Sequence, residues 1–215
     1  MRSVCLVVCL LTPLFGYAAP DATIGQELYE QHCASCHGED AAGETVPGSP
    51  ALKGFDSSYL VRQLENFKTG VRGTHEEDIQ GQLMAASLVP LESYQSFADI
   101  AEFVISLPEA SKIVDTRGDK KKGKAYYSSC VICHGEDGRG LPAMGGPNLL
   151  GLDAKYVTLQ INNFKKGIRG GHTLDTWGSM MGLMSRTLPN DQAIEDVLAY
   201  LNSDLNPPSR IRQDF

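Results

Sequence analysis

The chain has 215 residues, of which 42% are hydrophobic and 21% are charged, and its formal net charge is -7. This negative charge argues against nucleic acid as a partner, because the phosphate backbone attracts basic proteins. Beyond the N-terminus no apolar run approaches the roughly 20 residues of a membrane-spanning helix, and the length suits two ordinary domains.

The N-terminal residues have the pattern of a secretory signal peptide, which we place at 1–18. A single arginine is followed by an apolar segment, and small residues near its end favour cleavage after Ala18. An uncleaved anchor is an open alternative. We therefore expect an exported protein of the periplasm, soluble there or peripherally associated with a membrane.

The first predicted domain spans 20–107 and is helical. Amphipathic periodicity and capping residues indicate a helix from about Ile24 into a cysteine motif, a second from Asp56 to Phe67 and a third from Tyr94 to Leu107. Glycine- and proline-rich loops at 38–56 and 70–81 separate them, and loops of such length often wrap a ligand.

The cysteine motif has the form C-x-x-C-H and runs from Cys33 through Cys36 to His37. This is the attachment signature of c-type haem. Residues at i and i+3 of a helix share a face, so both thiols can reach the vinyl groups on one porphyrin edge. The histidine at i+4 projects from the same face and can ligate the iron.

The second half repeats the first at an offset of 97 residues. A linker at 108–119 leads to a second predicted domain at 120–206, and a polar tail follows at 207–215. Its motif carries Cys130, Cys133 and His134, so the sequence predicts two haems. Helices are expected at 123–133, 154–164 and 191–201, with loops between them. No segment reads convincingly as a strand, and the predicted fold class is all-α.

Other readings of one C-x-x-C motif fit less well. A thioredoxin-type site would follow a strand in an α/β pattern, which this sequence lacks. A zinc site would need a second ligand pair at finger-like spacing, and neither copy has one downstream. A structural disulfide is conceivable in an exported chain, but two copies with matching surroundings favour haem.

The sixth iron ligand determines whether a haem carries electrons or binds a substrate. After the signal peptide the first half has one methionine, Met84, and the offset aligns it with Met181. We predict these two as the axial partners of the histidines, because the one methionine of the first half has a partner in register. A His/Met pair keeps the iron six-coordinate and raises its potential. Met184 is the alternative for the second haem, and Met144 has a weaker claim.

Two further pairs lie in register around the motifs. Pro50 and Pro147 each begin P-x-L-x-G, where a backbone carbonyl could accept the second N–H of the axial histidine. A simple turn proline is the alternative. Arg72 and Arg169 lie in Gly-x-Arg-Gly segments and could pair with haem propionates, or could equally be solvated.

The net charge conceals an asymmetry between the halves. Residues 20–107 include 14 acidic and 4 basic side chains, whereas residues 108–215 include 12 acidic and 14 basic ones. Because surface charge steers encounters, we expect different redox partners for the acidic first domain and the mildly basic second domain. The lysines at 120–122 and 124 could face an acidic partner or an anionic membrane surface, or could be a solvated face.

With both C-x-x-C-H motifs, both P-x-L-x-G turns and both late methionines, the chain resembles the diheme class I cytochromes c, and most of all the periplasmic cytochrome c-four type. The resemblance implies two fused class I domains, each wrapped around one covalently attached haem, packed about a pseudo-twofold axis. It implies single-electron transfer, without a small-molecule substrate, to a membrane-bound oxidase or reductase or another redox protein.

Two alternatives to a free electron carrier remain open. One is an electron-transfer subunit of a larger dehydrogenase or oxidase complex. The other is an enzyme such as a diheme peroxidase or a thiosulfate-oxidising cytochrome, which would usually have one displaceable axial ligand. The symmetric halves, and the lack of a cysteine outside the motifs after the signal peptide, argue against an enzyme.

Overall fold

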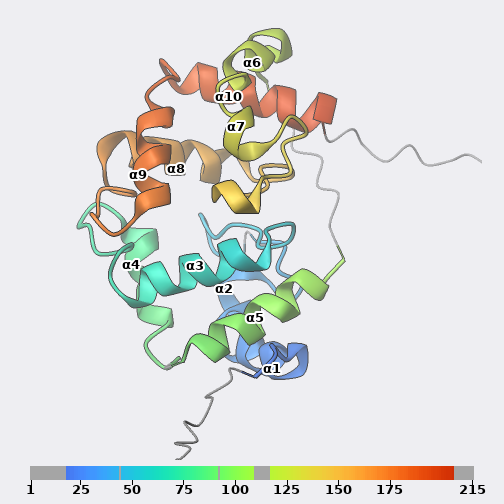
Figure 1. Cartoon of the computed structure of the whole chain (residues 1–215), viewed down its shortest axis with the longest axis vertical. Coiled ribbons are helices and arrows are strands. Elements are labelled where there is room, and N and C mark those ends of the chain that lie inside the picture. Colours follow the sequence, from blue (N-terminus) through green and yellow to red (C-terminus); the bar gives the residue numbers. More distant parts are fainter. Residues whose placement is uncertain (1–17, 44, 92, 109–116, 206–215) are drawn as a thin grey trace, which may run out of the picture.

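The computed structural model describes residues 18–43, 45–91, 93–108 and 117–205. The predicted signal peptide, most of the predicted linker and the polar tail therefore lie outside the described residues. Figure 1 shows two helical units stacked along the long axis of the molecule. Apart from one isolated β-bridge between Leu141 and Gly146, the regular structure of the described residues is helical, and the all-α prediction is confirmed.

The two units have parallel helix orders. The first contains α1 (Ala22–His32), α2 (Ala34–His37), α3 (Ser57–Lys68), α4 (Ile79–Ser87) and α5 (Tyr94–Ser106). The second contains α6 (Lys120–Tyr127), α7 (Val131–His134), η1 (Pro142–Met144), α8 (Ala154–Lys166), α9 (Thr176–Ser185), α10 (Asp191–Tyr200) and the π-helical turn η2 (Leu201–Leu205). None of the described helices combines the length and apolar character needed to cross a bilayer.

Two segments for which the sequence pattern predicted no helix are helices. The carboxylate of Asp78 accepts from the backbone N–H of Gly81 and begins α4, and that of Asp175 accepts from Gly178 and begins α9. Both helices are short and apolar without a clear stripe, so periodicity did not reveal them. They matter because they carry Met84 and Met181.

The helix predicted over 123–133 is also interrupted. It ends at Tyr127, and a new turn begins at Val131, so the first cysteine of the motif precedes the turn instead of lying within a longer helix. The same break separates α1 from α2 in the first unit.

The first and last helices of each unit cross at a glycine. An added Cβ at Gly25 would lie 1.9 Å from the carbonyl oxygen of Asp99, and one at Gly123 would lie 1.8 Å from that of Asp196. The backbones of α1 and α5, and of α6 and α10, therefore touch directly. Tyr29, on α1, is fully buried near the first crossing.

The carboxylates at these crossings also hold the chain entering each unit. Asp99 accepts from the backbone N–H of Asp21 at 2.9 Å, and Asp196 accepts from that of Asp119 at 2.8 Å. Each entering aspartate in turn caps the helix that follows it. The crossing is thus fixed on both sides, and it positions the cysteine motif that follows the first helix.

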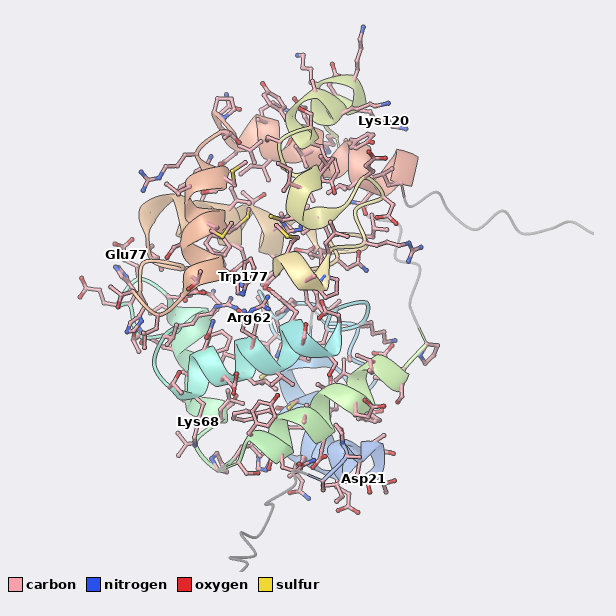
Figure 2. The ribbon with its side chains drawn as sticks, in the orientation of Figure 1. Asp21, Arg62, Lys68, Glu77, Lys120 and Trp177 are labelled. Atoms are coloured by element: carbon pink, nitrogen blue, oxygen red, sulfur yellow. The ribbon has the colours of Figure 1, made fainter. Side chains whose placement is uncertain are left out.

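The two units pack against one another through polar and apolar contacts. Leu149 and Val157 pack against the hydrophobic cores of both units. Arg62 donates to the carbonyl oxygen of Gly145 at 2.8 Å, and Asn148 donates to that of Gly54 at 3.0 Å. Figure 2 shows Arg62 beside Trp177 at this junction. The chain is therefore a pair of joined domains, with a defined interface between them.

Candidate cofactor sites

Each domain contains a cavity that the residues predicted from the sequence line. The first cavity is lined by Cys33, Cys36, His37, Pro50, Arg72 and Met84, among others. The second is lined by Cys130, Cys133, His134, Pro147, Arg169 and Met181. All twelve predicted residues thus converge on two places, although each set is spread over about 50 residues of sequence.

A single helical turn presents each cysteine motif to its cavity. The N–H of His37 donates to the carbonyl of Cys33 at 2.9 Å, and the N–H of His134 donates to that of Cys130 at the same distance. This i to i+4 bond is that of an α-helix, so both thiols and the imidazole project from one turn. The tyrosine of the preceding helix buttresses the turn, because Tyr29 donates to the carbonyl of Gly38 at 2.8 Å.

The two imidazoles are buried and oriented by the proline turns. His37 Nδ1 lies 2.9 Å from the carbonyl oxygen of Pro50, and His134 Nδ1 lies 2.9 Å from that of Pro147. Because a carbonyl only accepts, Nδ1 carries the proton, and the lone pair of Nε2 remains available to a metal. Burial lowers the pKa of both histidines and keeps them neutral, as ligation requires.

The cysteines are arranged for covalent attachment and not for zinc. Burial, with a smaller contribution from Cys36, raises the pKa of the Cys33 thiol to about 12. Zinc requires thiolates in a tetrahedral set. Among the described residues no group of three or more His, Cys, Asp or Glu side chains could hold a metal ion, and the four motif cysteines form no disulfide.

The methionines on α4 and α9 line the same two cavities as the cysteine motifs. Met84 and Met181 are partly buried and pack against the cores of their own domains. The second cavity is also lined by Met144, Met180 and Met184, which are between 37% and 42% exposed. Partial burial against the core distinguishes Met181 from the other three.

The two predicted arginines are not solvated. Arg72 donates to the side-chain oxygens of Gln63 at 2.7 Å and Gln160 at 2.9 Å. Arg169 donates to those of Gln160 at 2.8 Å and Gln63 at 2.9 Å. Each glutamine therefore accepts from both arginines, one from each domain. We call these four residues the arginine–glutamine ring; the sequence had shown only that the glutamines lie in register.

The ring creates a strongly positive environment at the domain junction. Tyr59 accepts from Arg169 at 3.0 Å and is buried. Burial alone would raise the pKa of its hydroxyl, yet the charges of Arg169 and Arg72 bring that pKa below its usual value. The Nε of Arg72 is buried without a hydrogen-bond partner. An anionic group of the cofactor would satisfy this environment.

Taken together, the donor set of each cavity fits a covalently attached haem. Two thiols, an oriented imidazole and a methionine line each cavity together with one buried arginine. The remaining walls are largely apolar, with aromatic side chains such as Phe55, Phe67 and Phe164. Such walls suit the apolar faces of a tetrapyrrole, for which each arginine would supply a positive charge.

Comparison with known proteins gives a consistent result. The family model described as Cytochrome c matches residues 22–108 and 120–204. The chain is 31% identical to a thiosulfate dehydrogenase electron acceptor of Stutzerimonas stutzeri (strain A1501), over 87% of this chain and 92% of that protein.

It is also 32% identical to a cytochrome c4 of Pseudomonas aeruginosa, over 76% of this chain and 83% of that one. Among solved structures, reduced recombinant cytochrome c4 from Pseudomonas stutzeri is similar, with a TM-score of 0.68 and 28% identity. That likeness covers 86% of this chain and 98% of the other.

Proposed function

The chain belongs to the cytochrome c family, with one cytochrome domain and one covalently attached haem c in each half, and we propose that it passes electrons through two His/Met-ligated haems. The predicted architecture of two tandem cytochrome c domains is confirmed. The protein is an electron carrier and not an enzyme, because its relatives are cytochromes c4 and electron acceptors.

We assign the axial ligands from the convergence of the paired residues. His37 and Met84 would hold the first iron, and His134 and Met181 the second, with both motif cysteines of each domain forming the thioethers. When bound, each haem supplies an iron that cycles between ferric and ferrous with one electron. One observation carries this proposal. In each domain the two cysteines, the histidine and the methionine, which are in register between the halves, all line the cavity of that domain.

Protein groups around each cavity hold the proposed iron ligands in place. The carbonyls of Pro50 and Pro147 hold each imidazole in one tautomer and one orientation. The partly buried methionines would occupy the remaining axial positions, so no open position would be left for a substrate. Ligands that do not change with oxidation state let an electron move with little rearrangement.

We expect the reduced wild-type protein to exclude carbon monoxide at neutral pH. Both axial positions would be filled by protein side chains, because His37 and Met84 line one cavity and His134 and Met181 the other. The measurement is the absorption spectrum of the dithionite-reduced protein before and after saturation with the gas. A stoichiometric shift of either haem's absorption bands would contradict two closed His/Met sites and would favour an enzyme.

A second candidate role concerns the electron donor. The chain spans almost the full length of a relative named thiosulfate dehydrogenase electron acceptor. This favours a role in which the protein accepts electrons from a dehydrogenase, either as a free protein or as a subunit of a complex. It could then pass these electrons toward an oxidase. Size-exclusion chromatography of a native extract separates these cases, because a stable subunit elutes with its dehydrogenase.

We place the protein in the periplasm. The signal-like N-terminus and the covalent attachment of haem, which takes place outside the bacterial cytoplasm, both support this location.

We further propose that the two domains meet partners of different charge. Exposed lysines lie in the first turns of α6, whereas the acidic excess lies in the first domain. Figure 2 shows Lys120 and Asp21 at opposite ends of the molecule. Charges separated in this way orient an approaching partner over about a Debye length, near 10 Å at moderate salt.

Charge reversal on each domain should change opposite reactions. Glu27→Lys with Glu39→Lys should slow reduction by cationic hexaammineruthenium, whereas Lys121→Glu with Lys122→Glu should slow oxidation by anionic hexacyanoferrate. Stopped-flow rates measured against ionic strength test this, and the differences should vanish at high salt. Equal salt slopes for both double variants and wild type would contradict domain-specific docking.

A further inference from the structure

One tryptophan connects two segments that line the second cavity. Trp177, the only tryptophan of the chain, is half-buried in the first turn of α9 and lines the cavity. Its indole ring lies directly against the backbone of Gly145, since an added Cβ there would lie 2.3 Å from the ring atom Cδ2. Figure 2 shows Trp177 between the start of α9 and η1. Trp177 therefore packs α9 onto the loop that follows η1.

This loop continues to the haem-attachment turn. The backbone of Gly146 lies against Cys133, because an added Cβ would be 1.9 Å from the carbonyl oxygen of that cysteine. The next residue is Pro147, whose carbonyl oxygen orients His134. We call residues 145–147 the glycine–proline loop of the second domain. It contacts both the attachment turn and Trp177.

Trp177 also shares a helix face with the proposed methionine ligand. Met181 is four residues further along α9, so the two side chains project from the same face, and both line the cavity. The contacts thus run from Met181 through α9 and Trp177 to the glycine–proline loop, and from there to His134. Trp177 joins the segments that carry the two ligands proposed for the second iron.

The first domain has a weaker form of the same connection. The 97-residue offset aligns Trp177 with Gln80 and Gly145 with Gly48. Gln80 is exposed, and the atom that an added Cβ at Gly48 would meet first is its Cγ, at 3.3 Å. An indole ring buries more apolar surface than the alkyl part of a glutamine, whose side chain also loses more rotamer freedom when it is held. The contact should therefore hold the helix less firmly in the first domain.

We propose that Trp177 is a positioning residue that holds α9 against the glycine–proline loop and thereby keeps Met181 on the second iron. The first iron, with Gln80 at the equivalent position, then releases its methionine more readily. This inference rests on the proposed function and adds a difference between the two sites that their paired ligands do not show. An external ligand can bind a six-coordinate haem only after the methionine has left. In the second domain that step moves α9, and the packing of Trp177 on Gly145 opposes it.

Imidazole is the probe of this exchange, because it binds ferric haem in place of methionine. The oxidised protein is mixed with imidazole in a stopped-flow instrument, and the loss of the methionine charge-transfer band is followed. We expect two phases in the wild type. Trp177→Gln should make the slower phase about tenfold faster, which is the order expected when the apolar burial of one half-buried aromatic side chain is lost. The faster phase should not change, and Trp177→Phe should restore most of the slow rate.

The reciprocal substitution tests the same contact in the first domain. Gln80→Trp should slow the faster phase toward the rate of the slower one, and it serves if Trp177→Gln does not accumulate with both haems. The matched control is Leu183→Gln. Leu183 is an exposed apolar residue of α9 that does not line the cavity, so its replacement should leave both phases unchanged.

An unchanged slower phase in Trp177→Gln, or an unchanged faster phase in Gln80→Trp, would overturn the inference. A single phase in the wild type would do the same. So would equal acceleration of both phases in Trp177→Gln, because that result indicates a general loosening of the protein. None of these results would affect the proposed function, which stands or falls on haem content and axial ligation of the wild-type protein without imidazole.

Discussion

Replacing Met181 with alanine is expected to remove the axial methionine from the second haem and leave the first intact. The long-wavelength absorption band that methionine ligation gives ferric haem should fall to half, because only one of the two sites loses its sulfur. The potential of the second haem should fall, since a methionine ligand raises it. Carbon monoxide should then bind one haem per chain.

The matched control is Met184→Ala. Met184 is one turn further along α9, lines the same cavity and is 37% exposed, whereas Met181 is partly buried against the core. We expect Met184→Ala to keep the full band and to exclude carbon monoxide. A halved band in Met184→Ala with a full band in Met181→Ala would reverse the assignment.

Replacing Gly123 with alanine is expected to destabilise the second domain severely. The new Cβ would lie 1.8 Å from the carbonyl oxygen of Asp196, a distance that no side-chain adjustment can relieve because the obstacle is backbone. Helices α6 and α10 would have to separate and expose Tyr127 and Leu198, which are almost fully buried. We expect a loss of about 3 kcal/mol or more.

Denaturant unfolding of the haem-loaded protein measures this effect, with Gly182→Ala as the control. Gly182 lies inside α9, and a Cβ there would make only an ordinary 3.5 Å contact. Alanine favours a helix over glycine by up to about 1 kcal/mol, so this variant should be neutral or slightly more stable. Unfolding of Gly123→Ala at the wild-type midpoint would mean that the helices do not cross as closely as described.

The haem attachment residues could be predicted from the sequence because their chemistry depends on local spacing. Two thioethers and one imidazole must lie on a single helical turn, and the five-residue motif encodes that turn completely. The internal duplication then added information that one copy lacks. It paired Met84 with Met181 and so selected one of four methionines.

The helices that carry these methionines could not be predicted in the same way. Periodicity detects a helix that has one apolar face and one polar face. In α4 and α9 the apolar residues are spread around the helix and form no single stripe. Each of these helices begins at a buried aspartate, Asp78 or Asp175. Its capping role is evident only in the structure, where the carboxylate accepts from the backbone N–H of the glycine three residues later.

The arginine–glutamine ring could not be predicted from the sequence either. Arg72 and Gln160 are 88 residues apart and come from different domains, so their contact depends on how the domains pack. The register of Gln63 with Gln160 was visible in the sequence, but a repeated glutamine has no chemical signature of its own. Only the structure shows that each glutamine side chain accepts hydrogen bonds from both buried arginines.

The central claim is that one chain carries two closed, His/Met-ligated haems that exchange electrons. A spectroscopic redox titration of the wild-type protein tests it most directly. The account predicts two electrons per chain, taken up in one-electron steps, and a methionine charge-transfer band in the ferric state with the intensity of two haems. A single electron per chain, or a band corresponding to one haem or none, would contradict it.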